Sequence, residues 1–181
     1  MSEVVLLSGG IDSAVCLWRA AKPIALFVDY GQPARVQELA AAQALCWARD
    51  CELAVMDAPL ALGKMGAVAG EPGPRVVGGR NAILLALGVN LAVERGASVV
   101  WIGAQPGDQD NYPDCRASFL TGLDRIYRAA YGVGVDAPLI MISRANLAAE
   151  ARRLPQGLTW SCYSAVDGRP CGTCNSCRQE R

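Results

Sequence analysis

VVLLSGGIDS, from Val4 to Ser13, is the stretch of sequence that decides the fold of this chain. Its four leading apolar residues predict a short buried strand, and the residues from Ser13 onward carry apolar side chains at helical spacing. The two glycines between these elements permit a tight turn, and the free N–H groups at a helix start favour a bound anion. The alternative is an ordinary turn in which Asp12 or Ser13 only caps the helix.

Strands and helices alternate along the rest of the chain. Short apolar runs predict further strands, and longer segments with helical periodicity predict helices. The expected strands after the first are residues 24–28, 53–56, 98–103 and 138–142, and the expected helices are residues 13–21, 33–50, 81–95, 116–131 and 146–154. This alternation indicates an α/β fold with an open, doubly wound, mainly parallel five-stranded sheet, whose ligands lie beyond the carboxyl ends of the strands.

Three polar segments follow predicted strands, and we expect them to meet in one site. They are residues 8–13, 29–32 and 103–116. The segment 57–79 contains many Gly and Pro residues without a clear period, so we interpret it as a long loop and a candidate lid. The segment 105–115 is expected to be a polar loop.

The composition bounds the class of protein. With 181 residues, of which 52% are apolar, the chain is expected to form a single domain over residues 1–181. The formal net charge is zero and the basic residues are scattered, which argues against a nucleic-acid partner. No apolar run approaches the roughly 20 residues of a membrane-spanning helix, and no signal peptide is recognisable, so we expect a cytoplasmic protein without a membrane partner. The chain contains no histidine, which excludes serine-hydrolase and most metallohydrolase mechanisms.

The eight cysteines differ in their surroundings. Cys16, Cys46 and Cys51 lie in apolar segments and are interpreted as small core residues. Four others lie among Gly, Pro, Ser and Asn near the C-terminus with gaps of eight, two and two residues, which is typical of a metal site rather than of a disulfide set or a redox CxxC pair. Four thiolates close the coordination sphere, so we expect a structural Zn²⁺ in the subregion 160–178. The expected ligands are Cys162, Cys171, Cys174 and Cys177.

The segment from Ser8 to Ser13 lacks the lysine of a Walker loop, so no cation is placed for γ-phosphate transfer. It resembles the SGGxDS signature of the PP-loop ATP pyrophosphatases. The resemblance implies an enzyme that cleaves ATP between its α and β phosphates and passes the adenylate to an acceptor. The expected nucleotide-binding residues are Leu7, Ser8, Gly9, Gly10, Ile11, Asp12 and Ser13, and Asp12 is also expected to reach a Mg²⁺ ion.

Motifs along most of the chain resemble those of one family within this superfamily, the 7-cyano-7-deazaguanine synthases. The matching segments are residues 29–32 (DYGQ), 79–81 (GRN), 112–116 (YPDCR), 137–139 (APL), 160–163 (WSCY) and 171–177 (CGTCNSC). The resemblance implies an ATP-dependent carbon–nitrogen ligase of queuosine biosynthesis. Such an enzyme activates 7-carboxy-7-deazaguanine as an adenylate and uses ammonia to form an amide and then a nitrile. The resemblance also implies a homodimer with one structural zinc per chain.

Two of these segments contain all of the candidate substrate residues except Asp108, which lies in the polar segment 103–116. Arg80 and Asn81 could present a guanidinium and an amide to phosphate or to the purine-like ring, or could be a surface arginine beside an N-cap. Arg116 is expected to pair with the substrate carboxylate, and an Asp114–Arg116 ion pair is the alternative. Cys115 is either a covalent nucleophile or a packed small residue. The expected substrate-binding residues are Arg80, Asn81, Asp108, Tyr112, Asp114, Cys115 and Arg116, and the expected catalytic residues are Asp12, Ser13 and Arg116.

Some positions depart from the family pattern. Arg144 and Asn146 stand where the family usually has a Lys and a Glu. A relative with such changes could stop at the amide, or could transfer the activated acyl group to another amine, such as one on a protein partner. Two other classes remain open. One is a PP-loop enzyme that thiolates tRNA, which should carry a basic surface, and the other is a non-catalytic nucleotide-binding module.

Overall fold

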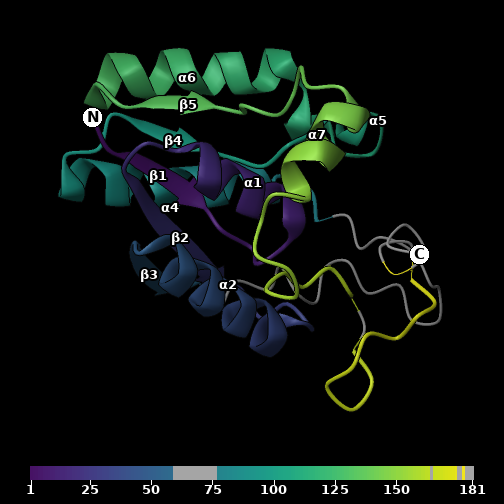
Figure 1. Ribbon diagram of the computed structural model, residues 1–181. Coiled ribbons are helices and arrows are strands. Elements are labelled where there is room, and N and C mark those ends of the chain that lie inside the picture. Colours follow the sequence, from purple (N-terminus) through teal and green to yellow (C-terminus); the bar gives the residue numbers. More distant parts are fainter. Residues whose placement is uncertain (59–76, 164, 175–176, 178–181) are drawn as a thin grey trace.

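The computed structural model describes residues 1–58, 77–163, 165–174 and 177 (Figure 1). Its strands form one sheet in the order β3-β2-β1-β4-β5, and every neighbouring pair is parallel. The strands are β1 (Glu3–Leu6), β2 (Pro23–Asp29), β3 (Glu52–Asp57), β4 (Val99–Trp101) and β5 (Gly134–Asp136). The predicted five-stranded α/β fold is confirmed.

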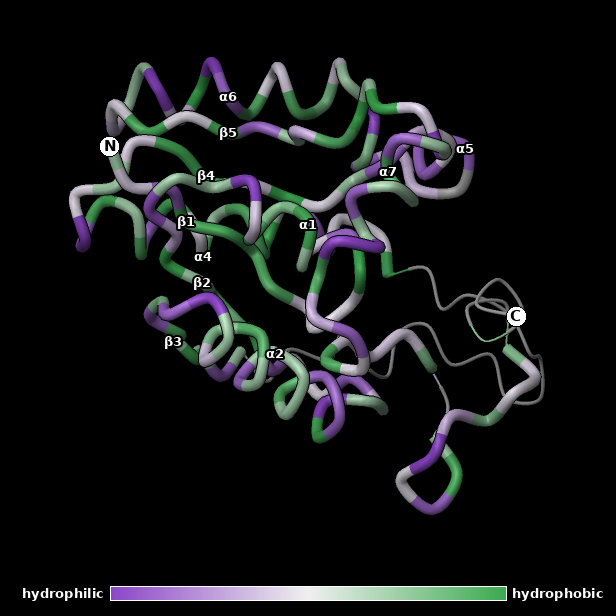
Figure 2. Tube along the Cα trace, in the orientation of Figure 1, coloured by the Kyte–Doolittle hydropathy of each residue, from purple (hydrophilic) through white to green (hydrophobic). Residues whose placement is uncertain are grey.

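Helices cover both faces of the sheet (Figure 1). Side chains alternate along the first strand, so that Val4 and Leu6 pack in one core cluster while Val5 and Leu7 pack in the other. Figure 2 shows hydrophobic residues running along the strands between the helices. The first cluster lies under α4 (Arg80–Arg95) and α6 (Ala117–Tyr131), and the second lies under α1 (Ile11–Arg19), α2 (Arg35–Arg49) and α7 (Arg144–Ala151).

The strand order reverses between β1 and β4, because β2 and β3 extend the sheet on one side and β5 extends it on the other. Open α/β sheets bind their ligands in the crevice at such a reversal, beyond the carboxyl ends of the strands. The predicted phosphate loop, residues 8–13, follows β1, and the polar loop 105–115, which contains four of the predicted substrate residues, follows β4. The fold therefore places both loops at one crevice.

The predicted strand at residues 138–142 is wrong, since the fifth strand lies earlier in the chain, at β5. Residues 138–142 form turns, in which the amide of Ile140 donates to the carbonyl of Ala137 and the amide of Ile142 donates to the carbonyl of Leu139, both at 3.0 Å. Leu139 is fully buried from within this turn. The apolar residues at 138–142 thus reflect burial rather than an extended backbone, and β5 is too short for a recognisable pattern.

The predicted polar loop at residues 105–115 is partly helical. It contains the short helix α5 (Asp108–Asn111) and the 3-10 turn η1 (Pro113–Cys115). The last predicted helix begins at Arg144, two residues earlier than expected, because the Oγ of Ser143 accepts from the amide of Asn146 at 3.2 Å as an N-cap. Most of the candidate lid at 57–79 lies outside the described residues. No helix in the described ranges is long and apolar enough to cross a membrane.

Candidate nucleotide site and metal centre

The turn between β1 and α1 brings the backbone of two glycines to the crevice. Gly9 has a φ of +79°, and a Cβ built on it would lie 2.5 Å from the carbonyl oxygen of Glu38, so only glycine fits there. Gly10 is the N-cap of α1, and a Cβ on it would make only ordinary contacts. Among the residues that the structure describes, no side chain caps the first turn of α1, so the alternative in which Asp12 or Ser13 does so is wrong. The N–H groups of this turn therefore remain available to an anion such as a phosphate group.

Two serine hydroxyls hold the loop in shape. Ser13 is buried, and its Oγ donates to the carbonyl of Gly10 at 2.9 Å and accepts from the amide of Ser8 at 3.2 Å. The Oγ atoms of the two serines lie 3.1 Å apart. Ser8 is exposed, whereas the side chain of Leu7 lies in the core. Ser8 can therefore reach a ligand with its side chain, and the predicted nucleotide-binding roles of Ser13 and Leu7 stay predictions.

Asp12 lies near a second carboxylate, which comes from the loop after β4. Burial raises the pKa of Asp12 to about 6, and the charge of Asp108 adds to this effect. Burial also raises the pKa of Asp108, although the amide of Gln105 and the charge of Arg144 act in the opposite direction. Two partly buried carboxylates at close range suit a divalent cation, because its charge offsets their repulsion. The structure thus brings the predicted magnesium ligand together with a predicted substrate residue.

A glycine and a glutamine hold the loop after β4 against α1. A Cβ built on Gly103 would lie 3.0 Å from the amide nitrogen of Ser13, so a larger residue would push the loop and α1 apart by a few tenths of an ångström. The side-chain Nε2 of Gln105 donates to Oδ2 of Asp12 at 3.2 Å. The backbone N–H of Gln105 donates to Oδ2 of Asp108 at 3.0 Å. No motif in the sequence marks Gly103 or Gln105. Their position just after a strand, at the edge of the sheet that binds ligands, is the signal that could have found them.

Asn81, Asp114 and Cys115, three of the predicted substrate residues, are linked by hydrogen bonds, and the guanidinium of Arg80 also donates to Oδ1 of Asn81 at 3.4 Å. Asn81 is buried. Its backbone N–H donates to Oδ2 of Asp114 at 3.0 Å, and its side-chain Nδ2 donates to Sγ of Cys115 at 3.3 Å. Burial raises the pKa of Cys115 to about 11, so its thiol is protonated at neutral pH. This favours the packed residue over the nucleophile as the role of Cys115. Together the three residues fasten the segment 112–116 to the start of α4.

Arg80, the first residue of α4, lies near a group of tyrosines. Burial raises the pKa of Tyr30 and of Tyr112, and the charge of Arg80 acts against this increase in both. The neighbouring hydroxyl of Tyr163 raises the pKa of each further. Aromatic faces beside a guanidinium suit a planar purine-like ring. Tyr30 and Tyr163 belong to matched segments, but their spacing alone does not predict that they meet.

Arg116, predicted to bind substrate and to take part in catalysis, lies at the protein surface. It is exposed at the N-cap of α6, and its backbone amide donates to the carbonyl of Pro113 at 3.2 Å. Its side chain makes no hydrogen bond or ion pair with any other described residue, so the alternative Asp114–Arg116 ion pair is not formed. A catalytic role for Arg116 stays a prediction.

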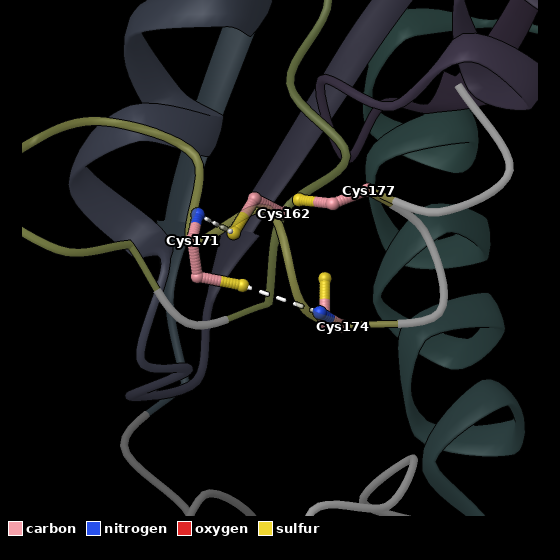
Figure 3. A group of neighbouring side chains, drawn as sticks. All are labelled: Cys162, Cys171, Cys174 and Cys177. Carbon is pink, nitrogen blue, oxygen red and sulfur yellow. Dashed lines mark hydrogen bonds between the residues drawn. The ribbon is translucent and has the colours of Figure 1, made fainter. Parts of the chain in front are cut away.

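The predicted zinc ligands come together in the structure (Figure 3). All four sulfur atoms lie within 4.8 Å of one another. A tetrahedral Zn²⁺ with Zn–S bonds of about 2.3 Å requires sulfur separations of roughly 3.8 Å, so only small shifts would close the site. The amide of Cys171 donates to Sγ of Cys162 at 3.2 Å, and the amide of Cys174 donates to Sγ of Cys171 at 3.3 Å. Hydrogen bonds from Thr173 and Cys174 lower the pKa of Cys171 to about 6. These features fit a thiolate-bound metal ion.

Solved structures with the same fold include RNA-modifying proteins. One is the U34-tRNA thiolase NcsA from Methanococcus maripaludis with its 4Fe-4S cluster, with a TM-score of 0.62 and 19% identity over 93% of this chain and 62% of that chain. Another is a predicted subunit of tRNA methyltransferase from Methanocaldococcus jannaschii, with a TM-score of 0.56 and 17% identity over 84% of this chain and 74% of that chain. At these identities the likeness concerns the fold alone.

Sequence comparisons identify the family. Residues 2–181 match the family described as queuosine biosynthesis protein QueC. The 7-cyano-7-deazaguanine synthase of Novosphingobium aromaticivorans is 38% identical, over 98% of this chain and 87% of that protein. The 7-cyano-7-deazaguanine synthase 1 of Sphingopyxis alaskensis is 36% identical, over 98% of this chain and 91% of that protein. The chain belongs to the QueC family of queuosine biosynthesis proteins.

Proposed function

We propose that the chain is an ATP-dependent carbon–nitrogen ligase of queuosine biosynthesis, which converts 7-carboxy-7-deazaguanine and ammonia into the nitrile for which its relatives are named. The observation that carries this proposal is the uncapped first turn of α1 beside the partly buried Asp12, at the reversal of strand order. Such a turn suits the phosphates of ATP, and such a carboxylate suits the magnesium ion that accompanies them.

The chemistry requires two activations of the same kind. A carboxylate oxygen of the substrate attacks the α-phosphorus of ATP, pyrophosphate leaves, and an acyl adenylate forms. Ammonia then attacks the acyl carbon, loses a proton and displaces AMP, which gives the amide. In the second activation the amide oxygen attacks the α-phosphorus of another ATP, and the loss of AMP and of both N–H protons leaves the nitrile. Each carboxylate oxygen therefore ends in a molecule of AMP.

The nucleotide half of the site would supply positioning and charge stabilisation. The first-turn amides of α1 and the hydroxyl of Ser8 hold the phosphates that leave as pyrophosphate. Asp12 would hold Mg²⁺, with the carboxylate of Asp108 nearby. Gln105 would orient both carboxylates through its hydrogen bonds. Ser13 keeps the loop in shape. None of these tasks requires a histidine.

The acceptor half would lie at the start of α4 and on the segment 112–116. The planar deazaguanine would bind against Arg80, Tyr30 and Tyr112. The effect of the Arg80 charge on the pKa of both tyrosines supports this, because it requires the three side chains to lie close together. The exposed Arg116 pairs with the substrate carboxylate. The bonded group of Asn81, Asp114 and Cys115 holds this wall in place.

The four cysteines would bind a structural Zn²⁺. Four thiolates fill the coordination sphere and leave no open position for a substrate. In a 4Fe-4S cluster each cysteine binds a different iron, so the sulfur atoms must stand farther apart than around one ion. Sulfur atoms within 4.8 Å of one another therefore support a single metal ion.

We also propose that the chain acts in the cytoplasm as one domain over residues 1–181, with the metal-binding subregion at 160–178, and as a homodimer. The family resemblance supports the dimer. Large exposed apolar side chains, such as Ile126 on α6 with 62% of its surface exposed, are compatible with such an interface.

Mass spectrometry of the products tests the proposed reaction. The protein is incubated with 7-carboxy-7-deazaguanine, ATP, magnesium and ammonia, and we expect the nitrile, with the amide as a transient species. An amide that is never converted would indicate a synthase-like enzyme that stops early. A persistent acyl adenylate would point to another amine as the acceptor, such as one on a protein. No consumption of the acid would contradict the proposal and favour a binding module.

A further inference from the structure

The metal site and the phosphate loop are joined by one short segment, residues 160–162. The amide of Trp160 donates to the carbonyl of Gly9 at 2.8 Å. The carbonyl of Trp160 would lie 3.8 Å from a Cβ built on Gly10. The backbone of Trp160 therefore lies against both glycines of the phosphate loop, and the metal ligand Cys162 follows two residues later.

The side chain of Trp160 ties this segment to the cysteine group. Its Nε1 donates to the carbonyl oxygen of Cys162 at 2.8 Å, and Sγ of Cys162 accepts from the amide of Cys171. Cys162 and Cys177 are only 3% and 6% exposed, whereas the other two ligands are half-buried. A continuous run of hydrogen bonds thus connects the metal ligands, through Trp160, to Gly9.

Gly9 is held from its other side as well. Its backbone lies so close to the carbonyl of Glu38 on α2 that no Cβ would fit. The phosphate loop is therefore held between α2 and the segment 160–162. Because its glycines have no side chains of their own, the loop depends on such neighbours to keep its amides aimed at one point.

We propose that Trp160 is a positioning residue that couples metal binding to nucleotide binding. This inference rests on the proposed function, because it assumes that the loop binds ATP. With the metal bound, the segment 160–162 holds the loop in its ATP-binding shape, and without the metal the loop loses that support. Coupling between two binding equilibria is reciprocal, so ATP tightens metal binding by the factor by which the metal tightens ATP binding. One hydrogen bond corresponds to a factor of roughly 2 to 13 in a binding constant, with about 5 as the central value.

The first test compares two conservative tryptophan variants. Trp160→Phe keeps an aromatic ring and removes the N–H that bonds to Cys162, and Trp47→Phe on the exposed face of α2 is the matched control. Titration calorimetry with magnesium and ATP should show affinity roughly 5-fold weaker in Trp160→Phe and unchanged in Trp47→Phe. Both variants should keep the zinc content of the parent. Equal ATP affinity in the two variants would overturn the inference.

The second test uses the unaltered protein and does not depend on how a variant folds. Its zinc affinity is measured at equilibrium by competition with a chelator, with and without magnesium and ATP. A titration of chelator, magnesium and ATP without protein corrects for zinc that the nucleotide itself takes up. We expect zinc to bind at least roughly 5-fold more tightly with ATP present. Unchanged zinc affinity in protein that binds ATP would contradict the coupling and leave the proposed function intact, whereas no ATP binding at all would contradict both.

Discussion

Gly103 lies directly against Ser13, since a Cβ built on Gly103 would stand 3.0 Å from the amide nitrogen of Ser13. This approach joins the loop after β4 to the first turn of α1, two segments that are far apart in the sequence. It is the reason that Asp108 lies near enough to raise the pKa of Asp12. The proposed nucleotide half of the site, with Asp12 from α1 and Asp108 from the loop after β4, depends on this contact.

Replacement of Gly103 should therefore disturb the site. In Gly103→Ala the added methyl group pushes α1 away from the loop, which should destabilise the protein by about 1–3 kcal/mol and weaken ATP binding at least tenfold. Gly122→Ala is the control, because Gly122 lies inside α6 with no atom within 4 Å of its built Cβ, and it should gain about 0.5–1 kcal/mol. Urea denaturation and calorimetry provide both quantities. Parental ATP affinity in Gly103→Ala would contradict the assigned site.

The ionised carboxylate of Asp12 should lower the free energy of unfolding at neutral pH, although the proposed activity needs it for magnesium binding. Its pKa of about 6 in the folded protein exceeds its ordinary value of 3.8, so the folded state holds the proton more tightly than the unfolded state does. Stability therefore falls as the pH rises through this interval, and the loss is complete at pH 7. Asp12→Asn removes a penalty of roughly 3 kcal/mol at pH 7 in the absence of magnesium, and it removes activity.

Urea denaturation of Asp12→Asn and its parent at two pH values checks this sign. The variant should be more stable at pH 7, and the difference should nearly vanish below about pH 3, where Asp12 is protonated in both the folded and the unfolded state. A variant that is less stable than the parent at pH 7 would show that burial of the charge is not the dominant effect.

The two glycines of the phosphate loop should respond differently to alanine. Gly10→Ala meets only ordinary contacts, so it should fold normally, yet its methyl group stands where a phosphate is expected and should abolish acid-dependent ATP–pyrophosphate exchange. Gly9→Ala has a positive φ and a clash with the backbone of Glu38, so it should lower the melting temperature markedly. Full exchange activity in Gly10→Ala would mean that the motif is only a turn.

The cysteine group should couple metal content to stability. Cys174→Ser removes one of the four ligands, so zinc content and melting temperature should fall together. Cys51→Ser, outside the group, should keep the zinc of the parent. Elemental analysis and thermal unfolding measure the two effects, and a Cys174→Ser protein with full zinc and unchanged melting would count against the site.

The fold is predictable from the sequence because its signals are local. The apolar run ending at Leu7, the glycine turn and the helical spacing that follows each depend on neighbouring residues, and they predict β1, the phosphate loop and α1. The apolar run around Leu139 shows the limit of such patterns. It is buried in a turn, and burial alone does not separate a strand from a turn.

The site is less predictable because it depends on which side chains face one another. Gln105 and Tyr163 gain their roles only when distant segments meet, so no spacing marks them. Conversely, Asn81 and Asp114 are polar residues in matching motifs, yet their hydrogen bonds join the start of α4 to the segment 112–116. A sequence motif identifies the chemical groups available at a site but not whether each one faces a ligand or a neighbouring residue.

The fate of the carboxylate oxygens tests the adenylation account most directly. The phosphate loop has no lysine for γ-phosphoryl transfer, and its uncapped amides beside Asp12 suit pyrophosphate as a leaving group with magnesium. With substrate labelled by oxygen-18 in its carboxylate, we predict AMP and pyrophosphate as the nucleotide products and the label in AMP, observed by phosphorus NMR. ADP and phosphate as the sole products, in a preparation free of adenylate kinase, would contradict adenylation even if the nitrile were formed.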